Sequence, residues 1–590
     1  MEILRTFDYL ENLKKFRPKD DMLSRKFQGK WIKYSIDQYI EYSHLTAYGL
    51  LALGYGAGTK IVSLCNNRPE WNFLDMGSAL AHMVHVPIYS TLSIDEYEFI
   101  INHCEAELIV IGNKNFYKRI SPVFERIDHP FKVIMMDEDE EVFSFPKLYE
   151  LGRENEEKFR PVVEDNKKNI DPDDIVSIIY TSGTTGTPKG VMLSHRNLTF
   201  NAHTHAIRQT KNSSHKMLSF LPLCHVYERS MNYEYQEVGI SIYYAEGLST
   251  IAADMADCHA DGFCAVPRVL DMMYNKLEAA GKKLKGLSWL IYKLAWRFAN
   301  RFDVYNKNPF YLWRQKIYDK LVYKKWRDAM GGKEMLVVAG GSSIRAKIVR
   351  TFNAAKLHIF EGYGMTEASP VICVNSPADG INVIGTVGTP IAGSEMKLAD
   401  DGEILTRGPH VMKGYYKNPE ATAEAIDADG WLHTGDIGSW VDGKYLKITD
   451  RKKEIFKLSA GKYIAPQPIE TYLKETKYID NCIVIGENQK LAAAIIIPNI
   501  EKLKGYAKRH HVAYKDVDDL IANEQVYNRI KRDVDEVNSK LAPYEAIKKF
   551  RLVNDEWTAA NGMLSQTLKL KRKNIIAKYS SIIDEIYQNG

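Results

Sequence analysis

The stretch that decides the fold is Tyr180-Thr-Ser-Gly-Thr-Thr-Gly-Thr-Pro-Lys-Gly-Val-Met-Leu-Ser-His195. Eight of its first ten residues are serine, threonine, glycine or lysine. Apolar residues at 175–179 and 191–193 predict two short strands, with the polar run as a loop between them. Glycines let backbone N–H groups approach an anion, hydroxyls add donors, and Lys189 adds a positive charge. The composition predicts a loop that binds phosphate.

The sequence suggests two other interpretations of this loop. The common P-loop needs Gly-x-x-x-x-Gly-Lys-Ser/Thr at the start of a helix, whereas here Lys189 is followed by Gly190 and an apolar strand pattern. Loops rich in serine, threonine and glycine are also ordinary surface turns. Sixteen residues of this arrangement favour phosphate binding over a surface turn.

The length and composition of the chain limit the classes of protein to which it can belong. With 590 residues it is long for one core and predicts two or more domains. An apolar content of 45%, a charged content of 26% and a net charge of +4 are those of a globular protein without a nucleic-acid partner. The seven scattered cysteines favour a reducing cytoplasm over a disulfide framework or a zinc site. Because neither a signal peptide nor a membrane span is predicted, the protein is expected to be soluble or peripheral.

Residues 1–170 alternate helical patterns with short apolar runs. Strands are predicted at 61–65, 84–89 and 108–111, and helices at 70–82 and 93–104. This alternation predicts an α/β domain with a largely parallel sheet. Residues 137–174, rich in charge and proline, are interpreted as a surface connector.

Residues 282–333 differ from the rest of the chain in charge. They contain 14 Lys or Arg against three Asp, a balance of +11 that leaves −7 for the remainder. Four of the nine tryptophans lie among them. Basic helices interleaved with aromatic residues are typical of elements that bind membrane interfaces. A solvated helical pair whose aromatic residues cover the domain is the alternative.

Two further motifs follow the basic segment. Residues 335–343 predict a strand that runs into a glycine turn at Gly341 and Ser342. The run Glu361-Gly-Tyr-Gly-Met-Thr-Glu367 follows another predicted strand. A carboxylate such as Glu367 beside phosphates would be repulsive unless a hard cation such as Mg²⁺ lay between them.

Together these motifs resemble the adenylate-forming superfamily of acyl-CoA synthetases, peptide adenylation domains and firefly luciferase. Three runs resemble the long-chain fatty-acid–CoA ligases in particular. They are Leu221-Pro-Leu-Cys-His-Val-Tyr-Glu-Arg229, the run from Glu361 to Pro370, and Thr567-Leu-Lys-Leu-Lys-Arg572. The resemblance implies an α/β fold with a large, multi-layer N-terminal domain at 1–450 and a small, mobile α+β domain at 451–590.

The resemblance also implies roles for individual residues. His225 would lie at the acyl pocket and thiol channel, and Mg²⁺ would bind Glu367 with Thr181. Lys453 would be the hinge of the small domain. Residues implied to bind ATP or AMP are Thr181, Ser182, Gly183, Thr184, Thr185, Gly186, Lys189, Gly341, Ser342, Glu361, Gly362, Tyr363, Gly364, Thr366, Asp436 and Arg451. Residues implied to meet CoA are Ser459, Ala460 and Gly461.

The catalytic lysine departs from the family pattern. The superfamily usually carries it in a Gly-Lys pair of the small domain, but residues 561–572 contain no such pair. Lys569 is the first candidate and Lys571 the second, while a lysine-rich strand edge on the surface is the alternative. The assignment therefore stays open between these residues.

The expected activity is ATP- and Mg²⁺-dependent activation of a long-chain fatty acid through acyl-AMP, with transfer to CoA. One alternative is a fatty acyl-AMP ligase that loads a carrier protein. Another is a catalytically inactive, nucleotide-binding protein at a membrane. Peripheral contact with the inner face of a membrane through 282–333 is an accompanying hypothesis, and a homodimer is compatible with the sequence. The sequence does not fix the acyl chain length.

Overall fold

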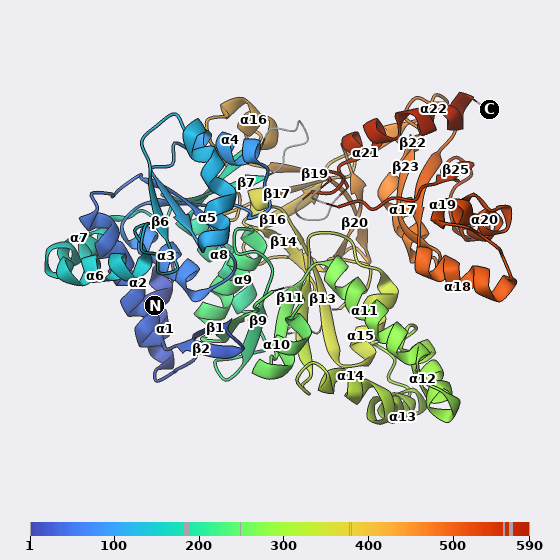
Figure 1. The fold of residues 1–590 in the computed structure, drawn as a ribbon, viewed down its shortest axis with the longest axis horizontal. Coiled ribbons are helices and arrows are strands. Elements are labelled where there is room, and N and C mark those ends of the chain that lie inside the picture. The colour runs from blue at the N-terminus through green and yellow to red at the C-terminus, as the bar shows by residue number, and fades with distance from the viewer. Residues whose placement is uncertain are drawn as a thin grey trace. The chain divides into compact units, whose positions relative to one another are not determined.

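The computed structural model describes residues 2–181, 188–247, 249–376, 378, 380, 382–558, 561–565 and 570–588 (Figure 1). The chain forms two compact units. The large unit comprises Met1–Met396 and Thr406–Leu432, and the small unit comprises Lys397–Leu405 and His433–Gly590. This division falls before the expected boundary at residue 450, because residues 433–450 belong to two paired strands of the small unit. In the part of the chain that is described, no helix combines the length and apolarity that crossing a bilayer requires.

Two sheets form the centre of the large unit. The nine-stranded sheet runs in the order β15 (Thr389–Pro390), β14 (Val371–Val374), β13 (Leu357–Gly364), β12 (Met335–Ala339), β11 (Gly262–Ala265), β9 (Lys216–Ser219), β10 (Ser241–Tyr244), β1 (Leu23–Phe27), β2 (Lys30–Tyr34). The seven-stranded sheet runs in the order β18 (Gly414–Tyr415), β8 (Lys189–Ser194), β7 (Ile175–Thr181), β4 (Val84–Pro87), β3 (Lys60–Leu64), β5 (Leu108–Ile111), β6 (Lys132–Met135). Both sheets are parallel at their centres. The nine-stranded sheet is antiparallel at both edges, and the seven-stranded sheet is antiparallel at the edge formed by β18, β8 and β7.

A layer of helices lies between the two sheets. It contains α3 (Pro69–Leu80) and α9 (Val226–Glu237), in which every residue except Glu237 is buried. On one side Asn72 donates a 2.7 Å hydrogen bond to the hydroxyl of Tyr244 in the nine-stranded sheet. On the other side Arg229 donates a 2.6 Å hydrogen bond to Ser177 in the seven-stranded sheet. These links to both sheets explain why neither helix has a solvent face.

Further helices cover the outer faces of the sheets. Apolar residues of α4 (Ile94–Cys104) pack on the seven-stranded sheet, and those of α10 (Ile251–Cys258), α11 (Pro267–Lys282) and α15 (Ala346–Ala354) pack on the nine-stranded sheet. The large unit is therefore a layered α/β structure, which confirms the predicted fold class. Other helices of this unit include α1 (Asp8–Leu13), α2 (Ile36–Ala52), α5 (Lys114–Ile120), α8 (His195–Ala206) and α16 (Pro419–Ala425).

The predicted surface connector at 137–174 is mostly helical. It forms α6 (Phe145–Glu154) and α7 (Glu156–Asn169). The buried residues of α6 include Phe145, Leu148, Tyr149 and Gly152, spaced as one helical face. The space beside Gly152 is closed, since a Cβ there would lie 2.4 Å from the carbonyl oxygen of Leu45 on α2. The segment contains so many charged residues that its sequence pattern did not indicate this apolar face.

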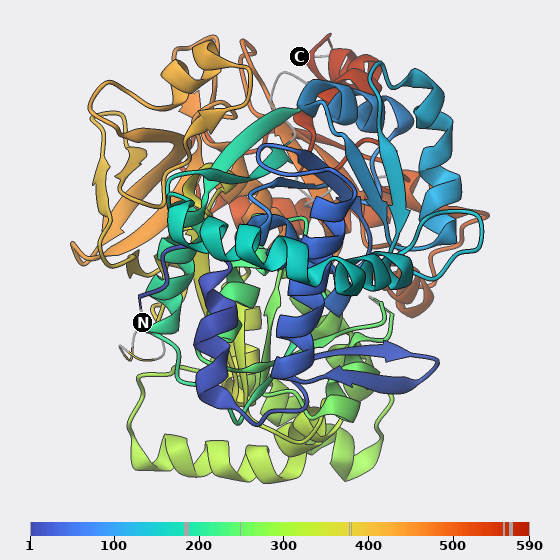
Figure 2. The ribbon, with the colours of Figure 1, turned by 90° about the vertical axis from the view of Figure 1, so that its left-hand side faces the viewer.

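The basic segment 282–333 consists of short helices in the large unit. They are α12 (Gly286–Ala299), α13 (Pro309–Tyr318), a π-helical turn (Asp319–Tyr323) and α14 (Lys324–Asp328). Phe298, Tyr323 and Trp326 form a small buried cluster under them. Figure 2 shows these yellow-green helices together at the lower end of the large unit.

The small unit has its own core of apolar residues. One sheet contains β16 (Glu395–Leu398), β17 (Glu403–Arg407), β19 (Leu432–Val441) and β20 (Tyr445–Arg451), although residues 395–396, 406–407 and 432 of these strands belong to the large unit. A second sheet is the pair β21 (Phe456–Lys457) and β22 (Tyr463–Ile464). The third contains β23 (Ile479–Ile485), β24 (Ala493–Pro498) and β25 (Lys549–Leu552). The helices of the small unit are α17 (Pro466–Glu475), α18 (Ile500–His510), α19 (Val517–Ala522), α20 (Glu524–Asn538), α21 (Arg572–Lys578) and α22 (Ser580–Gln588). β23 and β24 form an antiparallel hairpin. The chain ends in the two helices α21 and α22, which meet at Tyr579, a buried residue that accepts a hydrogen bond from the indole of Trp557.

Candidate active site

The polar loop predicted to bind phosphate joins two antiparallel strands. In the pairing of β7 with β8, Tyr180 lies opposite Gly190 and Thr181 lies opposite Lys189. The side chain of Tyr180 is buried, and its hydroxyl forms a 2.7 Å hydrogen bond with Nδ1 of His103. The hairpin base is thus anchored. Five predicted residues of the loop lie outside the described residues, namely Ser182, Gly183, Thr184, Thr185 and Gly186.

The strand β18 connects this hairpin to Glu367. The backbone N–H of Tyr416, the residue after β18, donates to the carbonyl of Gly190 at 2.7 Å. The N–H of Met412, just before the strand, donates to the carbonyl of Glu367 at 2.9 Å. The backbone of residues 412–416 therefore forms hydrogen bonds with the predicted phosphate hairpin at one end and with the predicted metal ligand at the other.

One side chain of β18, Tyr415, contacts both groups. Its hydroxyl donates a 2.8 Å hydrogen bond to Oε1 of Glu367. The ammonium of Lys189 lies 5.0 Å from the centre of the Tyr415 ring, within the range of a cation–π contact. Burial, with the Glu367 carboxylate as a smaller cause, raises the pKa of Tyr415 well above its usual value, so the hydroxyl stays protonated and donates. Sequence reasoning missed this residue.

Glu367 has the chemistry that the predicted Mg²⁺ would require. It lies in a short 3₁₀ turn (Thr366–Ala368), is half-buried, and has no ion-pair partner among the described residues. Mg²⁺ in nucleotide sites is commonly held by one or two carboxylates together with substrate phosphates. A single carboxylate beside a phosphate hairpin, with the hydroxyl of Thr181 at the hairpin base, fits that donor set. Among the described residues no preformed group of three His, Cys, Asp or Glu side chains is present.

The predicted glycine motifs lie on two neighbouring strands. In the parallel pair β12–β13, Ala339 lies opposite Glu361, so Gly341 and Gly362 both follow the point where this pairing ends. Ligands of open α/β sheets bind at such carboxyl ends. Gly364 is required by space, because a Cβ there would lie 1.9 Å from the carbonyl oxygen of Pro370. Ser342 is exposed, and Gly362 and Tyr363 are half-buried.

Glu361 in this motif is a buried carboxyl group. Burial raises its pKa to about 8, and a backbone N–H, that of Gly385, is directed at it at 3.4 Å. It is therefore mostly protonated near neutral pH. A neutral carboxyl group offers both a hydrogen-bond donor and an acceptor at the point where the pairing of β12 with β13 ends.

His225 is the N-cap residue of α9. Its Nδ1 accepts a 3.1 Å hydrogen bond from the backbone N–H of Tyr227, so this nitrogen carries no proton. Tyr227 in turn donates to the carbonyl of Val338 on β12 at 3.0 Å. The start of α9 is thus fixed beside the glycine turn at Gly340 and Gly341. The structure shows His225 as the cap of α9. Its role at the acyl pocket stays a prediction.

Asp436 and Arg451 are brought together in the small unit. They lie opposite each other in the antiparallel pair β19–β20, and Nε of Arg451 lies 3.3 Å from Oδ1 of Asp436. Neighbouring Asp450, which sequence reasoning missed, is buried and accepts from the N–H groups of Arg451 and Gln467. Burial raises its pKa to about 7.

The remaining predicted residues of the small unit occupy turns. Lys453 is exposed directly after β20, and Ser459, Ala460 and Gly461 form an exposed turn between β21 and β22. Lys571 precedes α21, and its backbone N–H donates to the carbonyl of Met563 at 2.9 Å. Lys569 lies outside the described residues.

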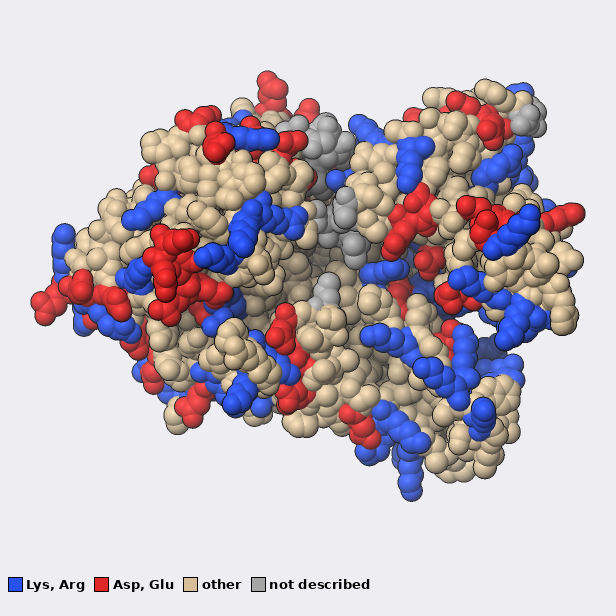
Figure 3. Space-filling model, in the orientation of Figure 1, with Lys and Arg blue, Asp and Glu red and all other residues tan. Residues whose placement is uncertain are grey.

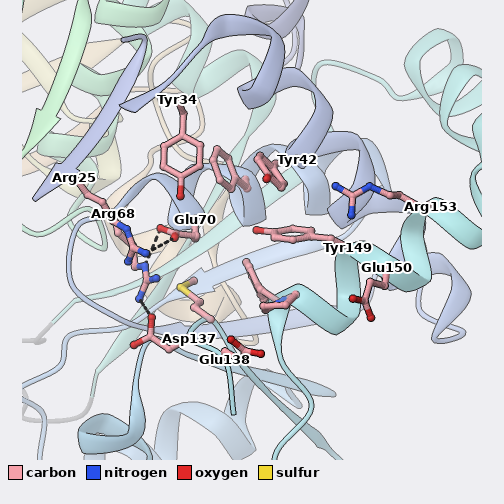
Figure 4. Close-up of a pocket in the computed structure, with 14 residues that line it drawn as sticks. Arg25, Tyr34, Tyr42, Arg68, Glu70, Asp137, Glu138, Tyr149, Glu150 and Arg153 are labelled. Atoms are coloured by element: carbon pink, nitrogen blue, oxygen red, sulfur yellow. Dashed lines mark hydrogen bonds and ion pairs between the residues drawn. The ribbon is translucent and has the colours of Figure 1, made fainter. Parts of the chain in front are cut away.

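A cavity of about 430 Å³ lies elsewhere in the large unit, lined by β1, β2, α2, α3 and α6 (Figure 4). None of the predicted site residues lines it. At one end, Glu70 lies 3.3 Å from Arg25 and 2.9 Å from Arg68, and Arg68 lies 2.8 Å from Asp137. These ion pairs tie β1, α3 and the segment after β6 together. We interpret this end of the cavity as structural.

A layered α/β unit with a hydroxyl- and glycine-rich hairpin beside the carboxylate of Glu367, which has no ion-pair partner among the described residues, defines the class of AMP-binding, adenylate-forming enzymes. The family model described as AMP-binding enzyme matches residues 13–416, and the model described as AMP-binding enzyme C-terminal domain matches residues 453–590. The adenylation domain of a carboxylate reductase from Mycobacterium chelonae has the same fold, with a TM-score of 0.75 at 18% identity over 99% of this chain and 91% of that one.

Relatives with greater sequence identity narrow the class. Long chain acyl-CoA synthetase 7 of Arabidopsis thaliana is 32% identical over 91% of this chain and 79% of the relative. Long-chain-fatty-acid–CoA ligase 1 of Homo sapiens is 31% identical over 95% of this chain and 82% of the relative. FadD15 of Mycobacterium bovis, also a long-chain-fatty-acid–CoA ligase, is 30% identical over 95% of this chain and 94% of the relative. The chain therefore belongs to the AMP-binding enzyme family, in its group of long-chain fatty-acid–CoA ligases.

Proposed function

We propose that this enzyme activates a long-chain fatty acid with ATP and transfers the acyl group to CoA. The carboxylate of the acid attacks the α-phosphorus of ATP, which forms acyl-AMP and releases pyrophosphate. The thiol of CoA then attacks the acyl carbonyl, and AMP leaves as the thioester forms. The observation that carries the proposal is the arrangement of Lys189, Tyr415 and Glu367 beside the β7–β8 hairpin.

In the first step the main tasks are positioning and stabilisation of phosphate charge. The backbone and hydroxyl groups of residues 181–186 would bind the β- and γ-phosphates, and the ammonium of Lys189 would neutralise part of their charge. Mg²⁺, held by Glu367 with Thr181, would supply further charge neutralisation between the phosphate oxygens. Tyr415 would keep the Glu367 carboxylate facing the hairpin.

The adenosine moiety would lie at the ends of β12 and β13, where Gly341, Ser342 and Glu361–Gly364 supply backbone and hydroxyl groups. Thr366 follows in the same motif. Asp436 would accept hydrogen bonds from the ribose hydroxyls, and Arg451 would hold Asp436 and donate to the nucleotide. His225, at the start of α9, would border the acyl and thiol path.

The second step would use the small unit differently. A lysine, Lys569 or Lys571, would stabilise the α-phosphate during adenylation, whereas Ser459, Ala460 and Gly461 would meet CoA during thioester formation. Because one site cannot hold both, a domain rotation about Lys453 between the steps belongs to the proposal. In this assignment 1–450 is the large domain and 451–590 is the swinging domain.

The proposal includes peripheral contact with the inner face of a membrane through 282–333. Such contact would bring the enzyme to a long-chain acid that partitions into lipid. The oligomeric state is open, with a homodimer allowed.

The experiment is product analysis with purified protein, palmitate, ATP, Mg²⁺ and CoA. Palmitoyl-CoA together with AMP and pyrophosphate is the expected result. Release of acyl-AMP without thioester would favour the alternative, a fatty acyl-AMP ligase that loads a carrier protein. The absence of pyrophosphate–ATP exchange with fatty acids of any length would favour an inactive nucleotide-binding protein and would overturn the proposal.

A further inference from the structure

The exposed apolar residues of this chain are concentrated in the basic helices. Eleven of the 22 large hydrophobic residues that are exposed in the described chain fall within residues 282–333. Scattered exposed apolar residues are ordinary, but contiguous patches mark interaction sites. Residues 282–333 are a small part of the chain, so the composition of the chain does not explain why half of these exposed hydrophobic residues lie there.

The helix α12 carries a leucine stripe on its outer side. Leu287, Leu290 and Leu294 are spaced by three and four residues, so they share one face, and they are 72%, 45% and 43% exposed. The adjacent side of the helix is used for packing, since Ala295, Phe298 and Ala299 are buried. The stripe therefore extends the apolar surface of α12 beyond its packed side, and the fold leaves this extension uncovered.

The helix α13 adds an aromatic pair. Phe310 and Trp313 are 64% and 56% exposed, and their rings stack with centroids 5.5 Å apart. Trp289 on α12 is 41% exposed and carries the ammonium of Lys293 at 4.5 Å from its ring. Tryptophan and phenylalanine beside lysine are typical of elements that lie in a membrane interface.

Positive charge surrounds these residues without compensation. Four of the basic residues of the segment have ion-pair partners, namely Lys282, Arg327, Lys324 and Lys333. The other ten have none among the described residues, and they include Lys283, Lys285, Lys293, Arg297 and Lys316. Figure 3 shows blue side chains separated by tan surface over α12 and α13 at the lower right. The surface thus combines uncompensated cations with exposed apolar rings and leucines.

We infer that α12 and α13 form a docking surface for anionic phospholipid, with the leucine stripe and the Phe310–Trp313 pair inserted among the acyl chains. Lysines at 283, 285 and 293 then face phosphate groups of the lipid headgroups. Nucleic acid would pair with the cations but would leave the leucine stripe in water. An acidic protein without an apolar surface would do the same. This inference specifies the membrane contact of the proposed function, but it concerns lipid chemistry and not the reaction.

The test is sedimentation of the full-length protein with vesicles of phosphatidylcholine that contain about 30% phosphatidylglycerol, at low and high salt. Binding to these vesicles, but only weakly to pure phosphatidylcholine, is the expected result. The basic variant Lys283→Ala/Lys285→Ala/Lys293→Ala should lose roughly 100-fold in partition coefficient. The apolar variant Leu287→Asn/Leu290→Asn/Phe310→Ser/Trp313→Ser should lose about tenfold or more and should bind residually in a salt-sensitive way.

Matched control variants carry the same kinds of change elsewhere on the large unit. Phe27→Ser/Val162→Ser/Ile207→Ser removes exposed apolar residues, and Lys118→Ala/Lys158→Ala/Lys168→Ala removes exposed lysines that have no ion-pair partner among the described residues. Both controls should bind vesicles as the wild type does. Circular dichroism and turnover of a short, water-soluble fatty acid show that each variant is folded.

Three outcomes would overturn the inference. They are wild-type binding that is equal on neutral and anionic vesicles, full binding by the apolar variant, and binding of a DNA duplex in place of vesicles. The docking surface and the proposed reaction can fail independently of each other. A wild type that forms acyl-CoA from soluble acid but ignores vesicles refutes the docking surface alone, whereas one that binds vesicles and forms no adenylate refutes the proposed function alone.

Discussion

Tyr415 donates a 2.8 Å hydrogen bond to Glu367, although 48 residues separate the two in the sequence. The contact exists because β18 pairs with β8, while Met412, just before β18, donates its backbone N–H to the carbonyl of Glu367. The same ring lies under the ammonium of Lys189. Tyr415 therefore positions a carboxylate and a cation of the proposed phosphate site relative to each other.

Replacement of Tyr415 by phenylalanine should lower kcat/KM for ATP by about 10- to 100-fold, because a hydrogen bond to a charged group is lost while the ring is kept. The Mg²⁺ concentration that gives half-maximal rate should rise, since the Glu367 carboxylate is no longer held. Pyrophosphate release measured across a Mg²⁺ titration checks both effects.

The matched control is Tyr416→Phe. Tyr416 is the next residue, is partly buried against the core of the seven-stranded sheet and lies with its ring against His103. Its variant should keep wild-type kinetics. Equal losses in the two variants would indicate a folding defect and would contradict the role of Tyr415.

The pair Asp436–Arg451 allows a second prediction. Asp436→Asn keeps the size of the side chain but removes the charge that faces Arg451, so we expect the KM for ATP to rise about tenfold with a smaller change in kcat. Steady-state kinetics with ATP as the varied substrate measure this. Asp442→Asn makes the same change at an exposed turn between the same two strands, where asparagine tolerates the positive φ of 51°. That variant should leave KM unchanged, and a KM that is unchanged in Asp436→Asn as well would remove Asp436 from the nucleotide site.

Sequence reasoning found the parts of the site that stand in contiguous motifs. The hairpin at 180–190 was predicted because its strands and its polar loop are adjacent in the chain, and β7 and β8 confirm it. Asp436 and Arg451 came from family motifs, and the register of β19 with β20 places them opposite each other.

Tyr415 could not be found in this way. It lies in a two-residue strand, too short for any periodicity, and its partners are set by strand pairing across the large unit. The helices α6 and α7 were missed for a different reason. Their apolar residues are few among charged ones, and only the packing of α6 on α2 shows that four of them form a face. In both cases tertiary contacts carry information that local pattern does not.

The choice between Lys569 and Lys571 can be made with half-reactions. The lysine that stabilises the α-phosphate should lower pyrophosphate–ATP exchange by roughly 100-fold or more when changed to alanine. It should leave the formation of acyl-CoA from chemically prepared acyl-AMP nearly unchanged, since that step uses the other orientation of the small domain. Lys573→Ala, an exposed position in the first turn of α21, serves as the control. Wild-type exchange in both Lys569→Ala and Lys571→Ala would show that neither lysine acts in adenylation.

The buried helix α9 predicts a pH dependence of stability. Burial raises the pKa of Glu228 to about 8, and its Oε2 has no hydrogen-bond partner among the described residues. Because the pKa in the folded state lies above its unfolded value of 4.5, the native state binds this proton more tightly. The stabilisation that the native state gains by binding this proton is fully present below about pH 4.5, and it is lost as the pH rises through about 8. The free energy of unfolding should therefore fall over this range.

Glu228→Gln removes the ionisation while keeping the shape of the side chain. Relative to the wild type, this variant should gain up to a few kcal/mol between acidic pH and about pH 8.5, since one pKa unit corresponds to about 1.4 kcal/mol. Urea unfolding at several pH values measures the difference, and Glu157→Gln, at an exposed position of α7, should follow the wild type throughout. Glu234 on the same helix also has a pKa raised by burial to about 8, so part of the slope should remain in Glu228→Gln. An identical slope in Glu228→Gln and the wild type would mean that Glu228 is ionised in the native state, and a water-filled space beside α9 would then have to solvate it.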